Sequence, residues 1–149
     1  MEEIKKEKAV LAGITNDRKD QPYSTQATMD ELAELAKTAS AEVCAVVLQP
    51  KDAPDAATYL GSGKLNELAE FCRTLEADLI IFDDELTGSQ QRNIEEATDT
   101  RVIDRSTLIL DIFASRAISL EGKLQVELAQ MKYMLPRLGG MGKSLSRLG

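Results

Sequence analysis

The stretch ADLIIFDDELTGSQQRNIEEATDTRVIDRS, residues 77–106, indicates the fold class most directly. Its first part, ADLIIFDDE, predicts an apolar strand that ends in three acids, and its last part, RVIDRS, predicts a second short strand. Between them, Thr87 and Gln90 are spaced as a capping box, which predicts a helix reaching about Thr98. Two apolar strands separated by a helix are typical of a βαβ unit in a parallel sheet.

The same alternation continues toward the N-terminus. Two further runs, KAVLAGI at 8–14 and EVCAVVLQP at 42–50, are apolar along most of their length, as strands of a parallel sheet are. Between these strands, Thr28 and Glu31 have the spacing of a second capping box, which predicts that a helix begins there. We therefore expect an α/β domain over residues 1–105, with a parallel sheet of about four strands flanked by helices. The pattern leaves the order of the strands open.

From Ser106 onward the pattern is helical. The segment STLILDIFASRA is apolar on almost all sides, which predicts a helix buried against the sheet. The next segment carries an apolar stripe at spacings of three and four residues. The stripe consists of Leu120, Leu124, Leu128, Met131, Leu135 and Leu138. We expect 106–138 to form a helical extension, followed by a glycine-rich basic tail over 139–149.

Such a stripe needs a partner helix, and the tail GGMGKSLSRLG does not supply one. The extension therefore resembles half of a helical hairpin, and we expect the sequence to be part of a longer chain. Two copies can also cover each other's stripes by pairing about a two-fold axis. We thus expect a homodimer through residues 120–138 when the rest of the hairpin is missing.

Composition excludes several classes of protein. The 149 residues include no His, which removes Ser-His-Asp and Cys-His catalysis, and we expect no catalytic residues here. The two cysteines, Cys44 and Cys72, fall in a predicted strand and a predicted helix, so we interpret them as reduced core residues. No apolar run approaches the ~20 residues of a membrane span, and the first residues, MEEIKKEKAV, lack a signal-peptide core. We expect a cytoplasmic protein without a membrane partner.

Two glycine-rich loops suggest phosphate binding. A P-loop requires a Gly, four residues, and then Gly-Lys-Ser/Thr. In TYLGSGKLNEL, residues 58–68, the first position is Thr58 and Leu65 stands where the hydroxyl belongs. In GGMGKS, residues 139–144, the first position is Arg137. Neither loop is a P-loop, and we expect no GTP hydrolysis from these residues.

Other candidate sites have weaker signals. Gly61, Gly63 and Lys64 at a helix start form a candidate anion- or nucleotide-binding site, although a tight turn with a glycine at positive φ explains them as well. Asp83 and Asp84, at the carboxyl end of a predicted strand, are a weak candidate Mg²⁺ site. The alternative function is therefore a small-ligand or ATP-binding enzyme domain that uses Lys64 and this carboxylate pair.

Charge is distributed unevenly along the chain. Residues 1–100 hold 10 Lys and Arg against 21 Asp and Glu, whereas residues 101–149 hold 8 against 4. Arg137, Lys143 and Arg147 lie near or within the glycine-rich tail, where cations can pair with RNA phosphates. A solvated linker explains the same charges.

Four segments, in this order and spacing, resemble the N-terminal region of the HflX family of ribosome-associated GTPases. They are TYLGSGKLNEL, ADLIIFDDELTGSQQRNIEEA, VIDRSTLILDIFASRA and EGKLQVELAQMKYMLPRL. The resemblance implies an α/β domain joined through a helical hairpin to a downstream GTPase domain, which would hold GTP and Mg²⁺. It also implies binding to the large ribosomal subunit and its RNA in the splitting and rescue of stalled ribosomes. The hairpin tip then matches the tail, which favours RNA contact by Arg137, Lys143 and Arg147.

Overall fold

The structure, a computed structural model, describes residues 6–15 and 25–138. The strands are Glu7–Thr15 (β1), Ala41–Pro50 (β2), Leu79–Phe82 (β3) and Arg101–Asp104 (β4). The helices are Thr25–Thr38 (α1), Ser62–Leu75 (α2), Gly88–Thr98 (α3), Arg105–Arg116 (α4) and Leu120–Leu138 (α5). The predicted α/β class with a C-terminal helical extension is confirmed. Within the described ranges, no helix is both long enough and apolar enough to cross a membrane.

The four strands are all parallel and lie in the order β2-β1-β3-β4. β1 is central, and its residues Ala9 to Ala12 are completely buried. The pairing between β1 and β2 shifts by one residue at Cys44, which forms a bulge because Ala9 faces Val43 and Val10 faces Ala45. β2 and β4 are the two edges of the sheet.

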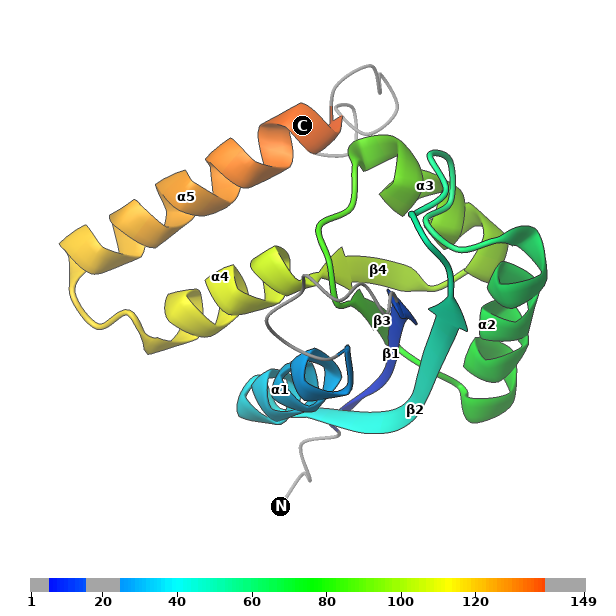
Figure 1. Cartoon of the computed structure of the whole chain (residues 1–149). Coiled ribbons are helices and arrows are strands. Elements are labelled where there is room, and N and C mark those ends of the chain that lie inside the picture. The colour runs from blue at the N-terminus through cyan, green and yellow to red at the C-terminus, as the bar shows by residue number, and fades with distance from the viewer. Residues whose placement is uncertain (1–5, 16–24, 139–149) are drawn as a thin grey trace.

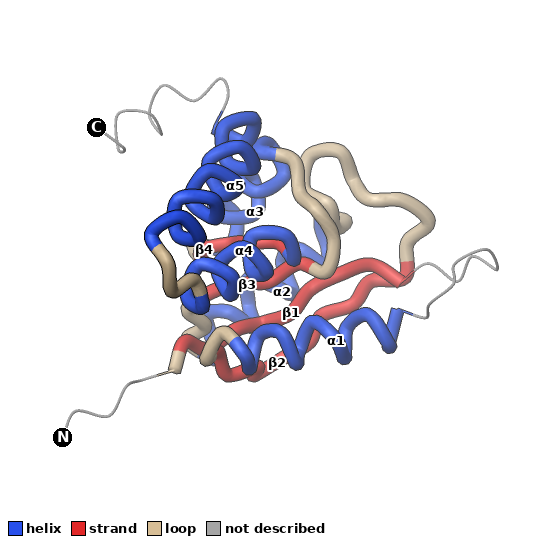
Figure 2. The backbone as a smooth tube through the Cα atoms, turned by 90° about the vertical axis from the view of Figure 1, so that its left-hand side faces the viewer, coloured by secondary structure: helices blue, strands red, loops and turns tan. Residues whose placement is uncertain are grey.

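Helices cover both faces of the sheet, with α2 and α3 on one side and α1 and α4 on the other (Figure 1). Turning the molecule shows α1 running along β1 and β2 (Figure 2). Leu68 and Ile94 belong to the core cluster under α2 and α3, and Leu32 and Leu108 to the cluster under α1 and α4. Both clusters end before residue 113, so the α/β body closes its core without α5.

One of the two predicted capping boxes is present. The Thr87 side chain accepts a hydrogen bond from the Gln90 N–H at 3.0 Å, and the Gln90 side chain accepts one from the Thr87 N–H at 2.9 Å. The box predicted at Thr28 is wrong, because α1 already begins at Thr25. The Thr28 hydroxyl instead donates to Asp83 Oδ2 at 2.8 Å. The Thr28 side chain, which the local pattern predicted to cap a helix, makes a tertiary contact instead.

Helix α4 is buried on one side only, which corrects the prediction of burial on almost all sides. It begins directly after β4, and only Leu108 and Ile112 are buried. Phe113 is 57% exposed. The helix packs on the sheet and α1 along one side, and α5 is its other neighbour.

Helix α5 leaves its apolar stripe uncovered. The helix runs antiparallel beside α4 and returns toward α3 (Figure 1). Leu124, Leu128, Met131 and Leu135 are 53–58% exposed. Within the described residues the predicted stripe therefore faces solvent, while Tyr133 and Arg137 face the α/β body.

We expect this chain to dimerise through residues 120–138. Full burial of a Leu or Met side chain stabilises by roughly 1.5–3 kcal/mol, and each stripe residue in the dimer provides part of this. Several such residues together offset the entropy lost on association, which costs about 4–15 kcal/mol. Light scattering at high micromolar concentration should give a dimer. Leu128→Lys combined with Leu135→Lys should give a monomer, whereas Gln125→Lys with Ala129→Lys, which adds the same charge outside the stripe, should not. A monomeric unaltered chain would contradict the prediction.

Candidate functional site

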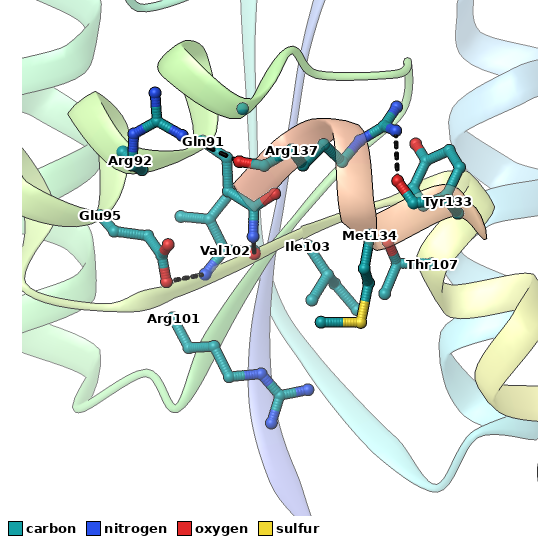
Figure 3. A pocket seen from close by; sticks show the side chains of 11 residues that line it. Gln91, Arg92, Glu95, Arg101, Val102, Ile103, Thr107, Tyr133, Met134 and Arg137 are labelled. Atoms are coloured by element: carbon teal, nitrogen blue, oxygen red, sulfur yellow. Dashed lines mark hydrogen bonds between the residues drawn. The ribbon is translucent and has the colours of Figure 1, made fainter. Parts of the chain in front are cut away.

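The end of α5 closes a pocket at the β4 edge of the sheet (Figure 3). The pocket has a volume of about 310 Å³ and lies between α3, β4 and α5. Its wall is fixed by two side chains of α3: Gln91 Nε2 donates to the Val102 carbonyl at 3.0 Å, and the Glu95 carboxylate accepts from the Val102 N–H at 3.3 Å. Here the helical extension is attached to the α/β body.

Asp104 is the buried centre of this attachment. It is the last residue of β4 and only 2% exposed. One carboxylate oxygen caps α4 by accepting from the Thr107 N–H at 3.0 Å and the Thr107 hydroxyl at 2.9 Å. The other accepts from the Leu86 N–H at 3.1 Å and from the Tyr133 hydroxyl of α5. One carboxylate therefore joins the loop before α3 to α4 and α5.

Gly88 allows the end of α5 to approach the start of α3. A Cβ atom at this position would lie 2.4 Å from the Arg137 carbonyl oxygen and 2.9 Å from its Cα. The same carbonyl accepts a hydrogen bond from Arg92 Nη1 at 2.8 Å. The negative end of the α5 dipole thus meets the positive N-terminal end of α3, which is a favourable arrangement.

The side chain of Arg137 is held inside this attachment. Its guanidinium carbon lies 3.4 Å above the centre of the Tyr133 ring, and Nη1 donates to the Tyr133 carbonyl at 2.7 Å. Its Nε is buried and has no hydrogen-bond partner among the described residues. Burial, together with the hydrogen bond to Asp104, raises the pKa of Tyr133, which therefore stays a neutral donor. Of the three predicted RNA-binding residues, Lys143 and Arg147 lie outside the described residues.

The predicted anion-binding residues have partners within the chain. The Gly61 N–H donates to Gln49 Oε1 at 2.8 Å, and Lys64 forms an ion pair with Glu67 at 3.1 Å. Gly61 has φ −66° and caps α2, so the predicted positive φ at a glycine is wrong. Tyr59 takes the left-handed conformation instead, with φ 64°. Its ring is buried, and its hydroxyl donates to Asp84 Oδ2 at 3.1 Å, so tertiary contacts hold this conformation.

The acids after β3 are used in structural contacts. Arg105 Nε donates to Asp83 Oδ1 at 3.2 Å, and its Nη1 donates to Glu31 Oε1 at 2.9 Å. Arg105 Nη2 also donates to the Thr28 carbonyl at 2.7 Å, which ties α1 to the carboxyl end of the sheet. Across the described part of the chain, no three His, Cys, Asp or Glu side chains are grouped so as to hold a metal ion. The candidate Mg²⁺ ligand Asp83 is thus paired with an arginine.

Most residues of this attachment were not predicted from the sequence. Asp104 had a usable signal, because an Asp three residues before Thr107 and directly ahead of an apolar helix is a common N-cap. The N-cap at Asp104 was not predicted, because RVIDRS was expected to form a strand as far as Ser106. No local pattern marks the other three residues, because their partners are distant in the sequence. The partner of Gly88 and Arg92 lies 45 residues or more away, and that of Tyr133 lies 29 residues away.

Comparison with known proteins identifies the family. Residues 26–114 match the family model described as "GTP-binding GTPase N-terminal", and residues 116–149 match "GTP-binding GTPase Middle Region". The GTPase HflX of Caldanaerobacter subterraneus subsp. tengcongensis is 52% identical over 151 residues, covering 100% of this chain and 34% of the relative. The chain belongs to the HflX family of GTPases. It spans about a third of the length of the curated HflX relatives it matches.

A further HflX relative and two solved structures also match this chain. The GTPase HflX of Escherichia coli is 43% identical over 110 residues, covering 74% of this chain and 26% of the relative. The crystal structure of the SsGBP and GDP complex matches with a TM-score of 0.73 at 25% identity, covering 95% of this chain and 39% of that one. A GTP-binding protein from Sulfolobus solfataricus in complex with GDP matches with a TM-score of 0.66 at 26% identity, covering 94% and 40%. This chain thus corresponds to the N-terminal and middle regions of HflX.

Proposed function

We propose that these residues form the ribosome-binding part of an HflX GTPase that binds the large ribosomal subunit and splits or rescues stalled ribosomes. GTP and Mg²⁺ would bind in the downstream GTPase domain, and the protein would act in the cytoplasm. The observation that supports the proposal most is the attachment of α5. Its last turn is fixed to the α/β body through Asp104, Gly88 and Arg92, directly before a segment that carries Lys143 and Arg147.

This arrangement suits contact with RNA. The chain contains no acid after Glu127, so the cations of residues 139–149 have no competing carboxylate nearby in sequence. Basic side chains bind RNA phosphates and release counterions, which makes such binding depend on salt. Because the end of α5 is attached to the body, the basic segment that follows it would begin at a fixed position. Arg137 would contribute indirectly, because its guanidinium packs on Tyr133.

We expect Lys143→Ala with Arg147→Ala to weaken sedimentation with large ribosomal subunits and to make its salt dependence shallower. Losing two phosphate contacts should reduce the slope of log K against log salt by about 1.4–1.8. Lys37→Ala with Arg73→Ala removes the same charge from the exposed surfaces of α1 and α2 and should leave the slope unchanged. An unchanged slope in the first variant would exclude direct phosphate contact. Arg137→Ala is compared separately, since it also disturbs the attachment of α5.

The alternative, an ATP-binding enzyme domain, has less support from the geometry. Lys64 is paired with Glu67, and Asp83 with Arg105, so a nucleotide with Mg²⁺ would have to displace both partners. Calorimetry with Mg²⁺-ATP and Mg²⁺-GTP separates the two functions. Heat of binding that disappears in Lys64→Ala would favour the alternative.

A further inference from the structure

One edge of the sheet is open. β2 has ten residues and pairs with β1 along one side, and no other described strand lies along its second side. β1 is buried from Ala9 to Ala12, whereas Val46 in β2 is 51% exposed. The outer side of an edge strand presents main-chain N–H and C=O groups that an added strand can pair with.

The opposite edge is closed by side chains. β4 has four residues, and the outward N–H and C=O groups of Val102 already bond to Glu95 and Gln91. The end of α5 also lies beside this edge (Figure 3). An incoming strand would have to break these contacts at β4, whereas β2 presents no such obstacle within the described residues. The two edges therefore differ in their capacity to bind a partner.

Apolar surface flanks β2 on both faces of the sheet. Ala45 and Val47 pack in the cluster under α2 and α3, so Val46 between them points to the α1 face. On the α2 face, a groove of about 360 Å³ lies between β2 and α2. Its apolar lining includes Leu75 and Phe71, which is 39% exposed. A strand added to β2 would place alternate side chains against Val46 and into this groove.

The rim of the groove is acidic. Glu67 and Glu70 line it, and their side chains are 50% and 64% exposed. Each pairs with a basic residue of α2 three positions away. The pair of Glu70 with Arg73 is exposed on both sides, and such a pair contributes at most about 1 kcal/mol. The Glu70 carboxylate can therefore pair again with an incoming cation. Residues 1–100 carry 21 acids against 10 bases, and this balance disfavours an RNA backbone as the occupant.

We propose that the β2 edge binds an extended, basic segment of a partner protein by strand addition, with an apolar side chain at every second residue of that segment. The inference rests on the proposed function, since the expected partner is a protein of the large ribosomal subunit. In this arrangement the acidic α/β body binds a protein, and the basic C-terminal segment binds RNA.

A photo-crosslink identifies the class of partner. The full chain with p-benzoylphenylalanine in place of Val46 is irradiated on purified large subunits, and the crosslinked product is digested with ribonuclease or protease. We expect a product that contains a ribosomal protein and survives ribonuclease. Crosslinking to RNA alone, or none while the chain is bound, would overturn the inference and leave the proposed function standing.

Charge reversal provides an independent measurement. Glu70→Lys should weaken subunit binding by about fivefold or more, because the added cation repels a basic segment. Glu34→Lys on α1 is the matched control, since Glu34 is 75% exposed and pairs with Lys37 at the same spacing, and it should not weaken binding. Equal binding by both variants, or tighter binding by Glu70→Lys, would refute a basic partner at this edge. If the unaltered chain does not bind subunits, both the inference and the proposed function fail.

Discussion

Asp104→Ala is expected to lower the free energy of unfolding by about 3–5 kcal/mol. The carboxylate is buried and accepts four hydrogen bonds, from the Leu86 N–H, the Thr107 N–H and hydroxyl, and the Tyr133 hydroxyl. Each buried donor left without a partner costs about 1–3 kcal/mol, and loss of an Asp N-cap alone costs about 1 kcal/mol. The free energy of unfolding of a typical domain is only about 5–15 kcal/mol, so the variant should be close to unfolding.

Urea denaturation measures this loss. The midpoint should fall while the slope of the free energy with urea stays the same, because the folded and unfolded states expose similar surface. Asp104→Asn should be intermediate: one oxygen can still cap α4, but the amide nitrogen cannot accept from Leu86. Asp30→Ala, on the exposed side of α1, is the control and should change stability by less than about 0.5 kcal/mol. If Asp104→Ala behaves like this control, the carboxylate is not the centre of the attachment.

Gly88→Ala is expected to detach the end of α5 from the body. The new methyl group would lie 2.4 Å from the Arg137 carbonyl oxygen, a main-chain atom, so α5 has to move. Moving it breaks the Tyr133 bond to Asp104 and the Arg92 bond to that carbonyl. These bonds together contribute about 2 kcal/mol, which corresponds to a roughly thirtyfold larger population of the detached helix.

Limited trypsin digestion under native conditions detects this change, since Arg137, which packs on Tyr133 in the attached helix, becomes accessible when the helix detaches. Gly63→Ala is the matched control: it also lies in the first turn of a helix, and a Cβ there has no atom within 4 Å. Alanine is the better helix former by about 1 kcal/mol, so the control should be neutral or slightly stabilising. Equal cleavage rates for both variants would show that α5 is not held at Gly88.

Local patterns were sufficient for the elements of the α/β body. The four strands are apolar runs of the kind that parallel sheets contain, and the Thr87 capping box depends on residues three positions apart. Both signals arise from interactions within a few residues, so a sequence displays them directly. The uncovered stripe of α5 was predictable for the same reason, because helical periodicity alone places Leu124, Leu128 and Leu135 on one side.

Contacts between distant residues decided the rest. The strand order β2-β1-β3-β4 depends on which apolar faces pack together, and a strand's own composition does not record its neighbours. Thr28 serves Asp83 rather than a cap, and Tyr59 adopts a positive φ because a buried ring and Asp84 hold it there.

The candidate site shows the same division. A basic C-terminal segment could be located from composition, because charge is a property of each residue. The attachment that positions it could not, since Gly88 and Arg137 meet across 49 positions in the sequence and Asp104 collects donors from three separate elements. Nothing near Gly88 in the sequence distinguishes it from a glycine at any other helix start. Only the folded chain brings that main chain so close that a Cβ atom on the glycine would lie within 3 Å of it.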